Sequence, residues 1–142
     1  MNAITQEPID IFTILRSSDD PSAGATVIFI GSVRDHNDTE KVSEIYYEAY
    51  EKMAENVLTE IEDKVLKKWN VKKFSAIHRI GNLKVNEISV AIAISTEHRQ
   101  DAFEACRYTI DTIKAKMPIW KKELLNSGMT EWKDGILPSH DK

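Results

Sequence analysis

The sequence holds a single cysteine, so it cannot form an internal disulfide, which suits a protein of the reducing cytoplasm. Its N-terminus has no basic stretch followed by a long apolar segment, and no later apolar run approaches the roughly 20 residues that span a bilayer. It also lacks the basic surplus of a general nucleic-acid binder, because its net charge is -4. We therefore expect a soluble, cytoplasmic protein that binds any anion through a local basic cluster.

The composition is that of a compact globular protein. The chain has 142 residues, of which 42% are hydrophobic and 30% are charged. A chain of this length buries roughly two thirds of its unfolded surface, so its stability requires neither a metal nor a disulfide. No internal repeat, low-complexity tract or linker divides it. We expect one domain over residues 1–142.

Three stretches have helical spacing. Residues 8–16 begin with a proline suited to a first helical turn and place Ile9, Phe12 and Ile14 or Leu15 inward. The second helix is expected from Tyr50 to Trp69, with a polar outer face.

The third helix is expected after residue 95, with Ser95 or Thr96 as N-cap and an end near Lys116, because Pro118 cannot continue it. Its apolar stripe comprises Ala102, Phe103, Cys106, Ile110 and Ile113.

The remaining apolar segments are predicted to be strands. Residues 25–34 are β-branched and aromatic, which indicates a strand buried on both faces. Residues 42–50 are a second strand. Further strands are expected at 71–81, 82–85 and 87–95, joined through a Gly81-Asn82 turn, and at 119–125 and 129–133. The fold class is therefore α+β.

Two of the candidate anion-binding clusters contain arginine. In "GSVRDHN", Arg34 follows the end of an apolar strand, where a guanidinium can hold a phosphate or form a surface ion pair. In "STEHRQDAF", His98 and Arg99 begin a helix, a position that is unfavourable for cations unless an anion sits there. A structural role beside the cap remains the alternative for His98.

The stretch "IDTIKAKMPIWKKELL", residues 110–125, gathers four lysines around a proline and a tryptophan. Lys114 belongs to the last helical turn, where a cation suits the helix dipole. Strand alternation after Pro118 puts Lys121 and Lys122 on opposite faces, so one of them can face Lys114. A lysine held near other cations or partly desolvated has a lowered pKa and can transfer protons or act as a nucleophile.

The other potentially reactive side chains are expected to have structural roles. Cys106 lies on an apolar helix stripe and is expected to be a core residue, and His78 and Arg79 are expected to form structural pairs. The sequence has no paired cysteines, no glycine-rich phosphate loop and no histidine spacing typical of a metal site. We therefore expect no metal and no cofactor.

Five segments between Gly24 and Trp132 carry a family resemblance: "GATVIFIGSVRDHN", "YYEAYEKMAE", "IHRIGNL", "STEHRQDAFEACRYTIDTIK" and "MPIWKKE". In this order they resemble the catalytic large subunits of molybdopterin synthase, the MoaE family. The segments "HRQDAFEA" and "PIWKKE" are the most specific.

The resemblance implies an α/β hammerhead fold with an additional small antiparallel sheet. It also implies a homodimer flanked by two copies of a small ubiquitin-like sulfur carrier, a heterotetramer. The activity it implies is a sulfurtransferase of molybdenum cofactor biosynthesis. That enzyme converts cyclic pyranopterin monophosphate, precursor Z, to molybdopterin with sulfur from the thiocarboxylate of the carrier's C-terminal Gly-Gly.

Carried over by position, the family's substrate-binding residues correspond to Ser32, Val33, Arg34, His98, Arg99, Lys114, Lys121, Lys122 and Glu123. The catalytic pair corresponds to Lys114 and Lys121. The segment "DHNDTEKV" lacks a glycine often found in that loop, and the tail after Trp132 is short.

The resemblance suggests roles for the lysines. We expect Lys114 to contact the thiocarboxylate and the attacked region of the pterin, and Lys121 to assist proton transfer. Lys122 is expected to turn away or to pair locally. Two other functions compete: a non-catalytic module that docks an acidic partner, and a phosphate-ester hydrolase, for which the sequence offers no metal set or nucleophile pair.

Overall fold

The computed structural model describes residues 1–133. In this part of the chain it has three helices and eight strands, in the order β1 (Asn2–Thr5), α1 (Ile11–Ser17), β2 (Ala25–Ser32), β3 (Val42–Ala49), α2 (Glu51–Lys68), β4 (Val71–Arg79), β5 (Gly81–Lys84), β6 (Ile88–Thr96), α3 (Arg99–Lys116), β7 (Ile119–Leu125) and β8 (Thr130–Lys133). The α+β class expected from the sequence is confirmed.

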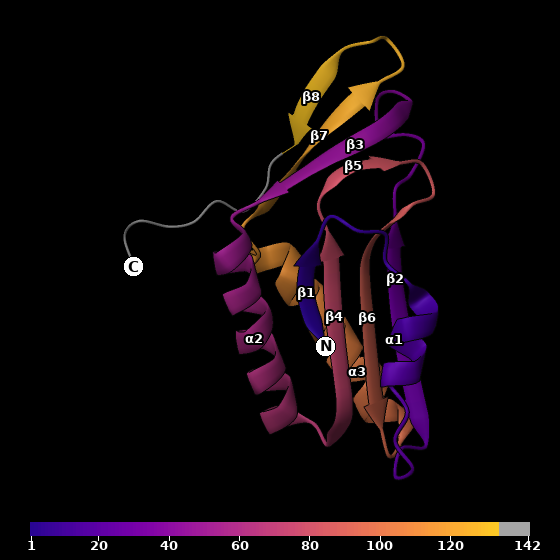
Figure 1. Cartoon of the computed structure of the whole chain (residues 1–142), viewed down its shortest axis with the longest axis vertical. Coiled ribbons are helices and arrows are strands. Elements are labelled where there is room, and N and C mark those ends of the chain that lie inside the picture. Colours follow the sequence, from indigo (N-terminus) through magenta and orange to yellow (C-terminus); the bar gives the residue numbers. More distant parts are fainter. Residues whose placement is uncertain (134–142) are drawn as a thin grey trace.

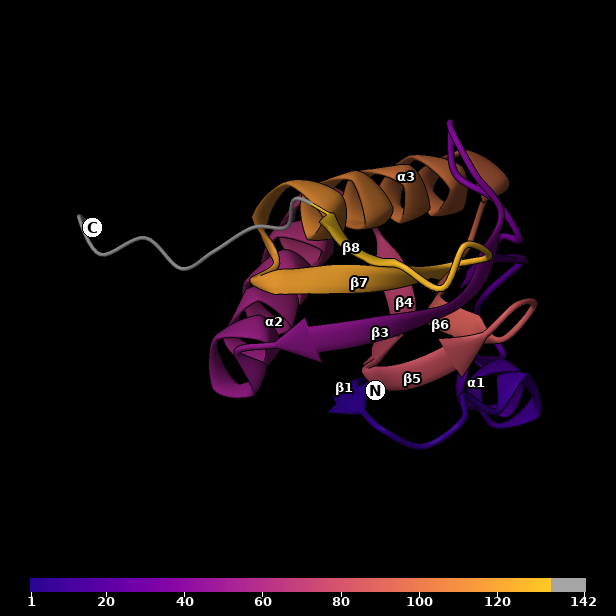
Figure 2. The same ribbon diagram turned by 90° about the horizontal axis from the view of Figure 1, so that it is seen from above.

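The strands form two four-stranded sheets (Figure 1). The large sheet has the order β1-β4-β6-β2, with β1 parallel to β4 and the other pairs antiparallel. The small sheet has the order β5-β3-β7-β8 and is antiparallel throughout. Figure 2 shows α2 and α3 on one face of the large sheet and α1 on the other.

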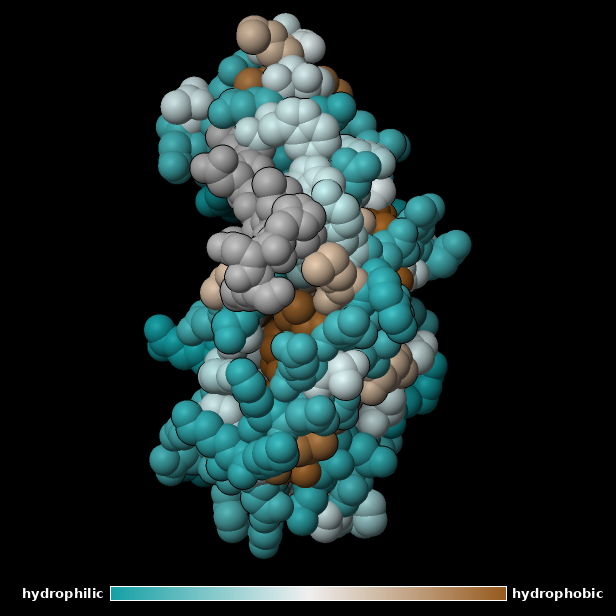
Figure 3. All heavy atoms as spheres, turned by 90° about the vertical axis from the view of Figure 1, so that its left-hand side faces the viewer, coloured by the Kyte–Doolittle hydropathy of each residue, from teal (hydrophilic) through white to brown (hydrophobic). Residues whose placement is uncertain are grey.

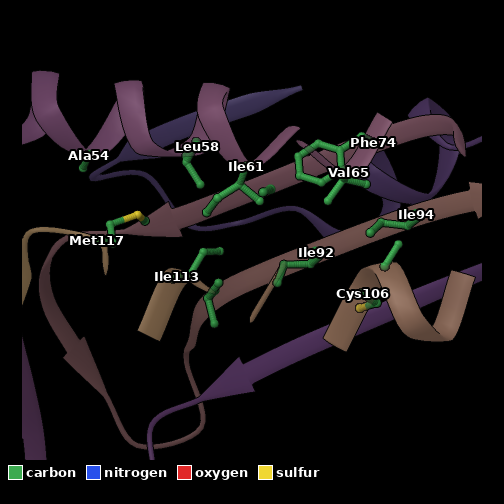
Figure 4. Packing of buried hydrophobic residues seen from close by; sticks show 13 residues of the cluster. Ala54, Leu58, Ile61, Val65, Phe74, Ile92, Ile94, Cys106, Ile113 and Met117 are labelled. Carbon is green, nitrogen blue, oxygen red and sulfur yellow. The ribbon is translucent and has the colours of Figure 1, made fainter. Parts of the chain in front are cut away.

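In the central strand β6, successive side chains point to opposite faces of the large sheet, and this alternation determines which helix packs on which face. Val90, Ile92 and Ile94 belong to the core beneath α2 and α3, whereas Ala91 and Ala93 pack against Ile14 of α1. Successive side chains of a strand point to opposite faces, so a strand covered on both sides must be apolar at every position. The small alanines therefore face the short helix, and the larger side chains face the main core (Figure 4).

Helix α2 covers the main core with one stripe of side chains. Ala54, Leu58, Ile61 and Val65 are buried at helical spacing and point toward the strands (Figure 4). Each large aliphatic side chain buried in this way contributes about 1.5 to 3 kcal/mol. The side of the molecule on which α2 lies is largely hydrophilic (Figure 3). Truncation of the fully buried Leu58 to alanine should destabilise this layer by about 2 to 5 kcal/mol.

The small sheet has its own core, formed by Val33, Val42, Ile45, Tyr47, Ile80, Leu83 and Leu125. Ile4 and Ile119 pack against both this core and the main one. These two isoleucines therefore dock the sheets onto each other.

The first helix is shorter than the sequence predicted. It begins at Ile11, because Asp10 caps it by accepting a hydrogen bond from the Phe12 amide, and Pro8 lies outside it. Phe12 is 72% exposed, so its expected inward position is wrong, and only Ile14 is buried. The strand β1, which pairs with β4, was missed.

The predicted environment of two strands also differs from the structure. Strand β2 is an outer strand and is only partly buried, so the prediction that it is buried on both faces is wrong. The strand that is buried on both faces is β6. The Gly81-Asn82 step is not a hairpin turn, because β4 and β5 belong to different sheets. Gly81 has a φ of 95°, a left-handed conformation that suits glycine and redirects the chain between the sheets.

The start of α3 was predicted too early. Ser95 and Thr96 are buried in β6, and the N-cap position belongs to His98, whose side chain makes no capping hydrogen bond. The helix ends at Lys116, as expected from Pro118. Ala102, Cys106 and Ile113 are buried, but Phe103 is 61% exposed because alanine and threonine fill the neighbouring positions of the stripe. None of the helices within residues 1–133 is long and apolar enough to cross a membrane.

Candidate functional site

A cavity of about 190 Å³ lies where the two sheets and the end of α3 meet. We call it the junction cavity. It is lined by Phe29, Gly31, Ser32, Arg34, His36, Ile45, Tyr47, Ser89, Val90, Lys114, Lys121 and Glu123. Five of the residues that the family resemblance implies are therefore gathered in one place: Ser32, Arg34, Lys114, Lys121 and Glu123.

An irregularity in β2 brings the first two of these residues to the cavity. The register between β2 and β6 shifts at Gly31/Ser32, and such a bulge redirects the side chains that follow it. At Gly31 a Cβ atom would lie 2.6 Å from Cγ1 of its cross-strand neighbour Val90, so a larger residue at this position would displace the Val90 side chain. Ser32 and Arg34 consequently face the cavity.

The two lysines come from consecutive elements. Lys114 lies in the last turn of α3, and the chain turns at Met117 and Pro118 into β7. In β7, Lys121 pairs with Tyr47 of β3, another residue of the cavity wall. Lys122 points to the opposite face, where its Nζ lies 5.1 Å from the centroid of the Trp132 ring. The alternation predicted for Lys121 and Lys122 is therefore confirmed.

The cavity changes the acid-base properties of Lys114. Partial desolvation lowers the pKa of the Lys114 ammonium, and the nearby positive charge of Lys121 lowers it further. Lys121 lies close to a carboxylate, because its Nζ is 4.0 Å from Oε2 of Glu123. The two lysines thus differ in environment: the proton of Lys114 is easier to remove than that of an exposed lysine, whereas Lys121 lies beside a carboxylate.

Glu123 is an acid in a cationic cavity. It is only 4% exposed, and its Oε1 accepts a hydrogen bond of 2.9 Å from the side-chain amide of Asn37. Burial raises the pKa of the Tyr47 hydroxyl, and the charge of Glu123 raises it further, although a hydrogen bond with Ser89 acts in the opposite direction. Tyr47 is thus a neutral hydrogen-bonding group on the cavity wall.

Three polar residues of the cavity wall were missed from the sequence: His36, Tyr47 and Ser89. His36 follows Arg34 by two positions in a loop, and its Nδ1 lies 2.7 Å from Oδ1 of Asp35. Its position in "RDHN", two residues after Arg34, could have indicated that His36 lies near the site. Tyr47 and Ser89 had no such signal, because each lies in a strand of ordinary composition and reaches the site only through sheet packing.

Four residues implied by the resemblance lie elsewhere. Val33 is 2% exposed in the core of the small sheet, and Lys122 is on the far face of that sheet. His98 and Arg99 line a separate hollow at the start of α3, beside Gly24 and Phe103. Because a helix rises 1.5 Å per residue, Arg99 and Lys114 are about 22 Å apart along its axis. One copy of the chain therefore cannot place both on one small molecule.

The residues given structural interpretations are buried or paired. His78 contacts the Tyr47 ring edge to face, with 5.3 Å between centroids, and burial lowers its pKa to about 4. Arg79 forms an ion pair of 3.0 Å with Glu87. Burial raises the pKa of the Cys106 thiol to about 11, so it is a poor nucleophile.

The junction cavity combines three cationic side chains with one buried carboxylate and several neutral hydrogen-bonding groups. Within residues 1–133, no group of three or more His, Cys, Asp or Glu side chains could hold a metal ion. Arg34, Lys114 and Lys121 instead suit anionic ligands, since guanidinium and ammonium groups form charge-assisted hydrogen bonds with phosphate and carboxylate oxygens. The cavity can bind an anion and exchange a proton with it.

The sequence matches known proteins over most of its length. The family described as "MoaE protein" matches residues 4–116. The molybdopterin synthase catalytic subunit of Thermoplasma volcanium is 43% identical over 129 residues, which cover 91% of this chain and 94% of the relative. The human protein of the same name is 40% identical over 129 residues, which cover 91% of this chain and 68% of the relative.

Solved structures agree with the sequence comparison. The molybdopterin synthase of Staphylococcus aureus superposes with a TM-score of 0.87 at 39% identity, covering 93% of this chain and 96% of the other. A chain in the complex of subunits 1 and 2 of the molybdopterin-converting factor of Helicobacter pylori has a TM-score of 0.78 at 20% identity, covering 94% and 90%. The latter likeness is one of fold.

Proposed function

This chain belongs to the MoaE family, and on that premise we propose that it is the catalytic subunit of a molybdopterin synthase, a sulfurtransferase of molybdenum cofactor biosynthesis. The observation that carries the proposal is the convergence of Arg34, Lys114 and Lys121 on the junction cavity. Its substrate is cyclic pyranopterin monophosphate. Two sulfur atoms come from the C-terminal thiocarboxylate of a small carrier protein, and the product is the dithiolene molybdopterin.

The positively charged side chains of the cavity can reduce the electrostatic repulsion between the two anionic reactants. The pterin carries a phosphate, and the sulfur donor is a thiocarboxylate, so two anions must approach each other. Two like charges at 4 Å repel by about 1 kcal/mol in water and by several times more near a protein surface. Fixed positive groups offset this repulsion where the charges meet. We assign phosphate binding to Arg34 and stabilisation of the thiocarboxylate to the lysines.

The pKa direction of Lys114 supports a division of roles different from the one expected from sequence. Each transfer forms a carbon–sulfur bond on the pterin side chain while a carbon–oxygen bond there breaks, and the departing oxygen needs a proton. Water then cleaves the bond between the sulfur and the carrier's acyl carbon, which leaves the carrier with an ordinary carboxylate. Lys114, whose pKa is lowered, is the better candidate for this proton transfer. Lys121, which lies 4.0 Å from the Glu123 carboxylate, is the better candidate for the fixed charge that orients the thiocarboxylate.

The size of the junction cavity supports a site shared between two chains. Pockets that enclose a drug-sized ligand have volumes of about 300 to 1,000 Å³. The cavity, at about 190 Å³, is smaller. We assign His98 and Arg99 to the pocket of a second copy in a homodimer, because the length of α3 keeps them from the cavity of their own chain. The tail after Lys133, which could also contribute to a neighbour's pocket, lies outside the described residues.

We propose a heterotetramer in which each copy of this chain binds one ubiquitin-like carrier. The Helicobacter pylori neighbour is a protein-protein complex of subunits 1 and 2, which supports such a partner. We further assign the large sheet and its helices to an α/β hammerhead and the small sheet to the family's additional antiparallel sheet. We also propose that residues 1–142 form one domain and that the protein is cytoplasmic.

The competing functions make different demands on the cavity. A docking module needs only charge, so an arginine should replace Lys114 without loss. A phosphate-ester hydrolase needs a metal or an activated nucleophile, and within residues 1–133 no metal cluster occurs and the one cysteine is buried.

Reconstitution tests the proposed function directly. The purified chain is mixed with thiocarboxylated carrier and cyclic pyranopterin monophosphate, and the dithiolene is measured after conversion to a fluorescent derivative. We expect product only when the carrier ends in a thiocarboxylate; carrier ending in an ordinary carboxylate is the matched control. If the complete mixture forms no dithiolene while the chain binds the carrier, the chain is a docking module and the proposal is wrong.

A further inference from the structure

The loop between β2 and β3 is organised by one side chain, that of Asn37. Its Oδ1 accepts hydrogen bonds from the backbone amides of Thr39 and Glu40, at 2.9 and 2.8 Å, and from the Thr39 hydroxyl at 3.0 Å. The Asn37 backbone amide donates to the Glu40 carbonyl at 2.9 Å. Three donors at Oδ1 fix the orientation of the side-chain amide, so its Nδ2 must point the other way.

Nδ2 of Asn37 points at a residue 86 positions away. It donates a 2.9 Å hydrogen bond to Oε1 of Glu123, which is buried in β7. The other oxygen, Oε2, lies 4.0 Å from the Lys121 ammonium. The two oxygens of one carboxylate therefore face the loop and the lysine of the junction cavity.

The same loop is fixed to the small sheet at a second place. The Glu40 carboxylate accepts a hydrogen bond from the Ser127 amide at 3.1 Å, and the Lys41 carbonyl accepts one from the Asn126 amide at 3.0 Å. Residues 34–36, which precede Asn37, supply Arg34 and His36 to the cavity wall. The conformation of this loop is therefore linked to the position of the β7 lysine.

We infer that Asn37 is a positioning residue for sulfur transfer: it holds the Glu123 carboxylate, and through it Lys121, in one geometry relative to Arg34. The inference rests on the proposed function for its catalytic meaning. Its structural basis is independent, because a buried carboxylate needs hydrogen-bond donors and Asn37 supplies one from the loop between β2 and β3. A small displacement of a positioned group can reduce the rate about 100-fold without weakening binding to the same extent.

Asn37→Asp is the sharpest variant. The new carboxylate keeps an acceptor for the Thr39 and Glu40 amides, so the turn is preserved, but it loses the donor to Glu123 and places a like charge there. Asn126→Asp is the matched control, because it makes the same chemical change on an exposed side chain of the adjoining turn. Both variants are assayed as the full chain with thiocarboxylated carrier.

For Asn37→Asp we expect kcat to fall about 10- to 100-fold, with the KM for the pterin within about twofold of the wild-type value. For Asn126→Asp we expect both constants to stay within about twofold of the wild-type values. An Asn37→Asp enzyme with unchanged kcat, or a loss that appears in KM alone, would overturn the positioning role.

A second measurement does not depend on activity. The double variant Asn37→Asp/Glu123→Gln exchanges the two groups, so that the amide of position 123 can donate to the carboxylate of position 37. Each single variant should lower the Tm by about 3 °C, and the exchanged pair should recover part of this loss. A double variant no more stable than the sum of the single losses shows that the two side chains are not coupled.

These measurements separate two kinds of failure. If the wild-type complex forms no dithiolene, the proposed function fails, and the Tm values still decide whether Asn37 and Glu123 are coupled. If the wild-type complex is active and Asn37→Asp matches it, the proposed function stands and the inference about Asn37 is wrong.

Discussion

Lys121 and Lys122 are adjacent in the chain, yet their ammonium groups lie on opposite faces of the small sheet. Lys121 lines the junction cavity with Lys114, whereas the Lys122 Nζ lies 5.1 Å from the Trp132 ring centroid and 5.9 Å from that of Tyr46. The two residues carry the same charge on the same strand. They therefore form an internal comparison between a cavity lysine and a lysine that packs on aromatic rings.

The first prediction uses this comparison. Lys121→Ala should reduce kcat for dithiolene formation by about 100- to 1,000-fold, the loss expected when one fixed electrostatic stabiliser is removed, while carrier binding persists. Lys122→Ala should lose much less, because its side chain faces away from the cavity. Single-turnover assays and carrier titrations measure both. Equal losses in the two variants would mean that bulk charge on β7, rather than the cavity position, governs the reaction.

The second prediction concerns proton transfer by Lys114. Lys114→Arg keeps the positive charge but removes an accessible deprotonated form, so sulfur transfer should fall about 100-fold or more at every pH tested. In the wild-type enzyme, the basic limb associated with Lys114 should lie below the usual range of lysine, because desolvation and Lys121 lower its pKa. Near-normal single-turnover transfer by Lys114→Arg would leave Lys114 as an electrostatic anchor only.

The third prediction concerns phosphate affinity. Arg34→Ala should weaken pterin binding by about 1 to 3 kcal/mol, as expected for charge-assisted hydrogen bonds, with the larger effect in KM. Arg107→Ala is the control, because Arg107 is exposed on α3 and pairs with Asp111 at 3.7 Å. Calorimetric titration with the pterin measures the affinity of each variant. Unchanged affinity in Arg34→Ala would place the phosphate outside the junction cavity.

The fourth prediction tests whether two copies share a pocket. Light scattering should give a homodimer for the chain alone and a heterotetramer with carrier. At pterin concentrations well below the wild-type KM, Lys114→Ala and Arg99→Ala should each have little activity, the first through kcat and the second through weaker substrate binding. When the two are unfolded and refolded together, mixed dimers contain one pocket with both residues intact, so activity should return to about a quarter of the wild-type value. No recovery in verified mixed dimers would show that Arg99 serves its own chain.

The fifth prediction is a pH dependence of stability caused by His78. Its pKa is lowered from 6.5 to about 4 by burial, so the unfolded state binds the proton more tightly than the folded state. The free energy of unfolding should therefore fall as pH drops from about 6.5 toward 4, by about 2 kcal/mol between pH 7 and pH 5 from this residue alone.

His78→Gln isolates this contribution. The variant should be less stable at pH 7, because it loses the ring contact with Tyr47, but its stability should change less between pH 7 and pH 5. Urea unfolding at the two pH values measures the difference. Parallel pH profiles for the wild type and the variant would contradict the assignment.

Local signals in the sequence were sufficient for most elements. The apolar period of α2 and the break at Pro118 mark helix bodies and ends that depend on residues close in the chain. The four residues of β1 have no such signal, since they become a strand by pairing with β4 more than 70 positions away. The separation of β4 and β5 into different sheets is equally non-local.

The site was predictable to a similar extent. The rigid link at Pro118 made the convergence of Lys114 and Lys121 readable from sequence. Tyr47 reaches the same cavity only because β3 pairs with β7, and no spacing within either strand indicates this. Phe103 shows the opposite error: it has a core residue's chemistry, but alanines on α3 already fill the space beside the sheet.

Ile4 and Ile119 join the two cores, and this arrangement makes the distance between Lys114 and Lys121 a property of tertiary packing. Lys114 is carried by a helix on the large sheet, and Lys121 by a strand of the small one. Neither sheet alone holds the reactive geometry. Under the proposed function, we therefore expect turnover to fall when the contact between the two sheets loosens, while each sheet still keeps its backbone hydrogen bonds.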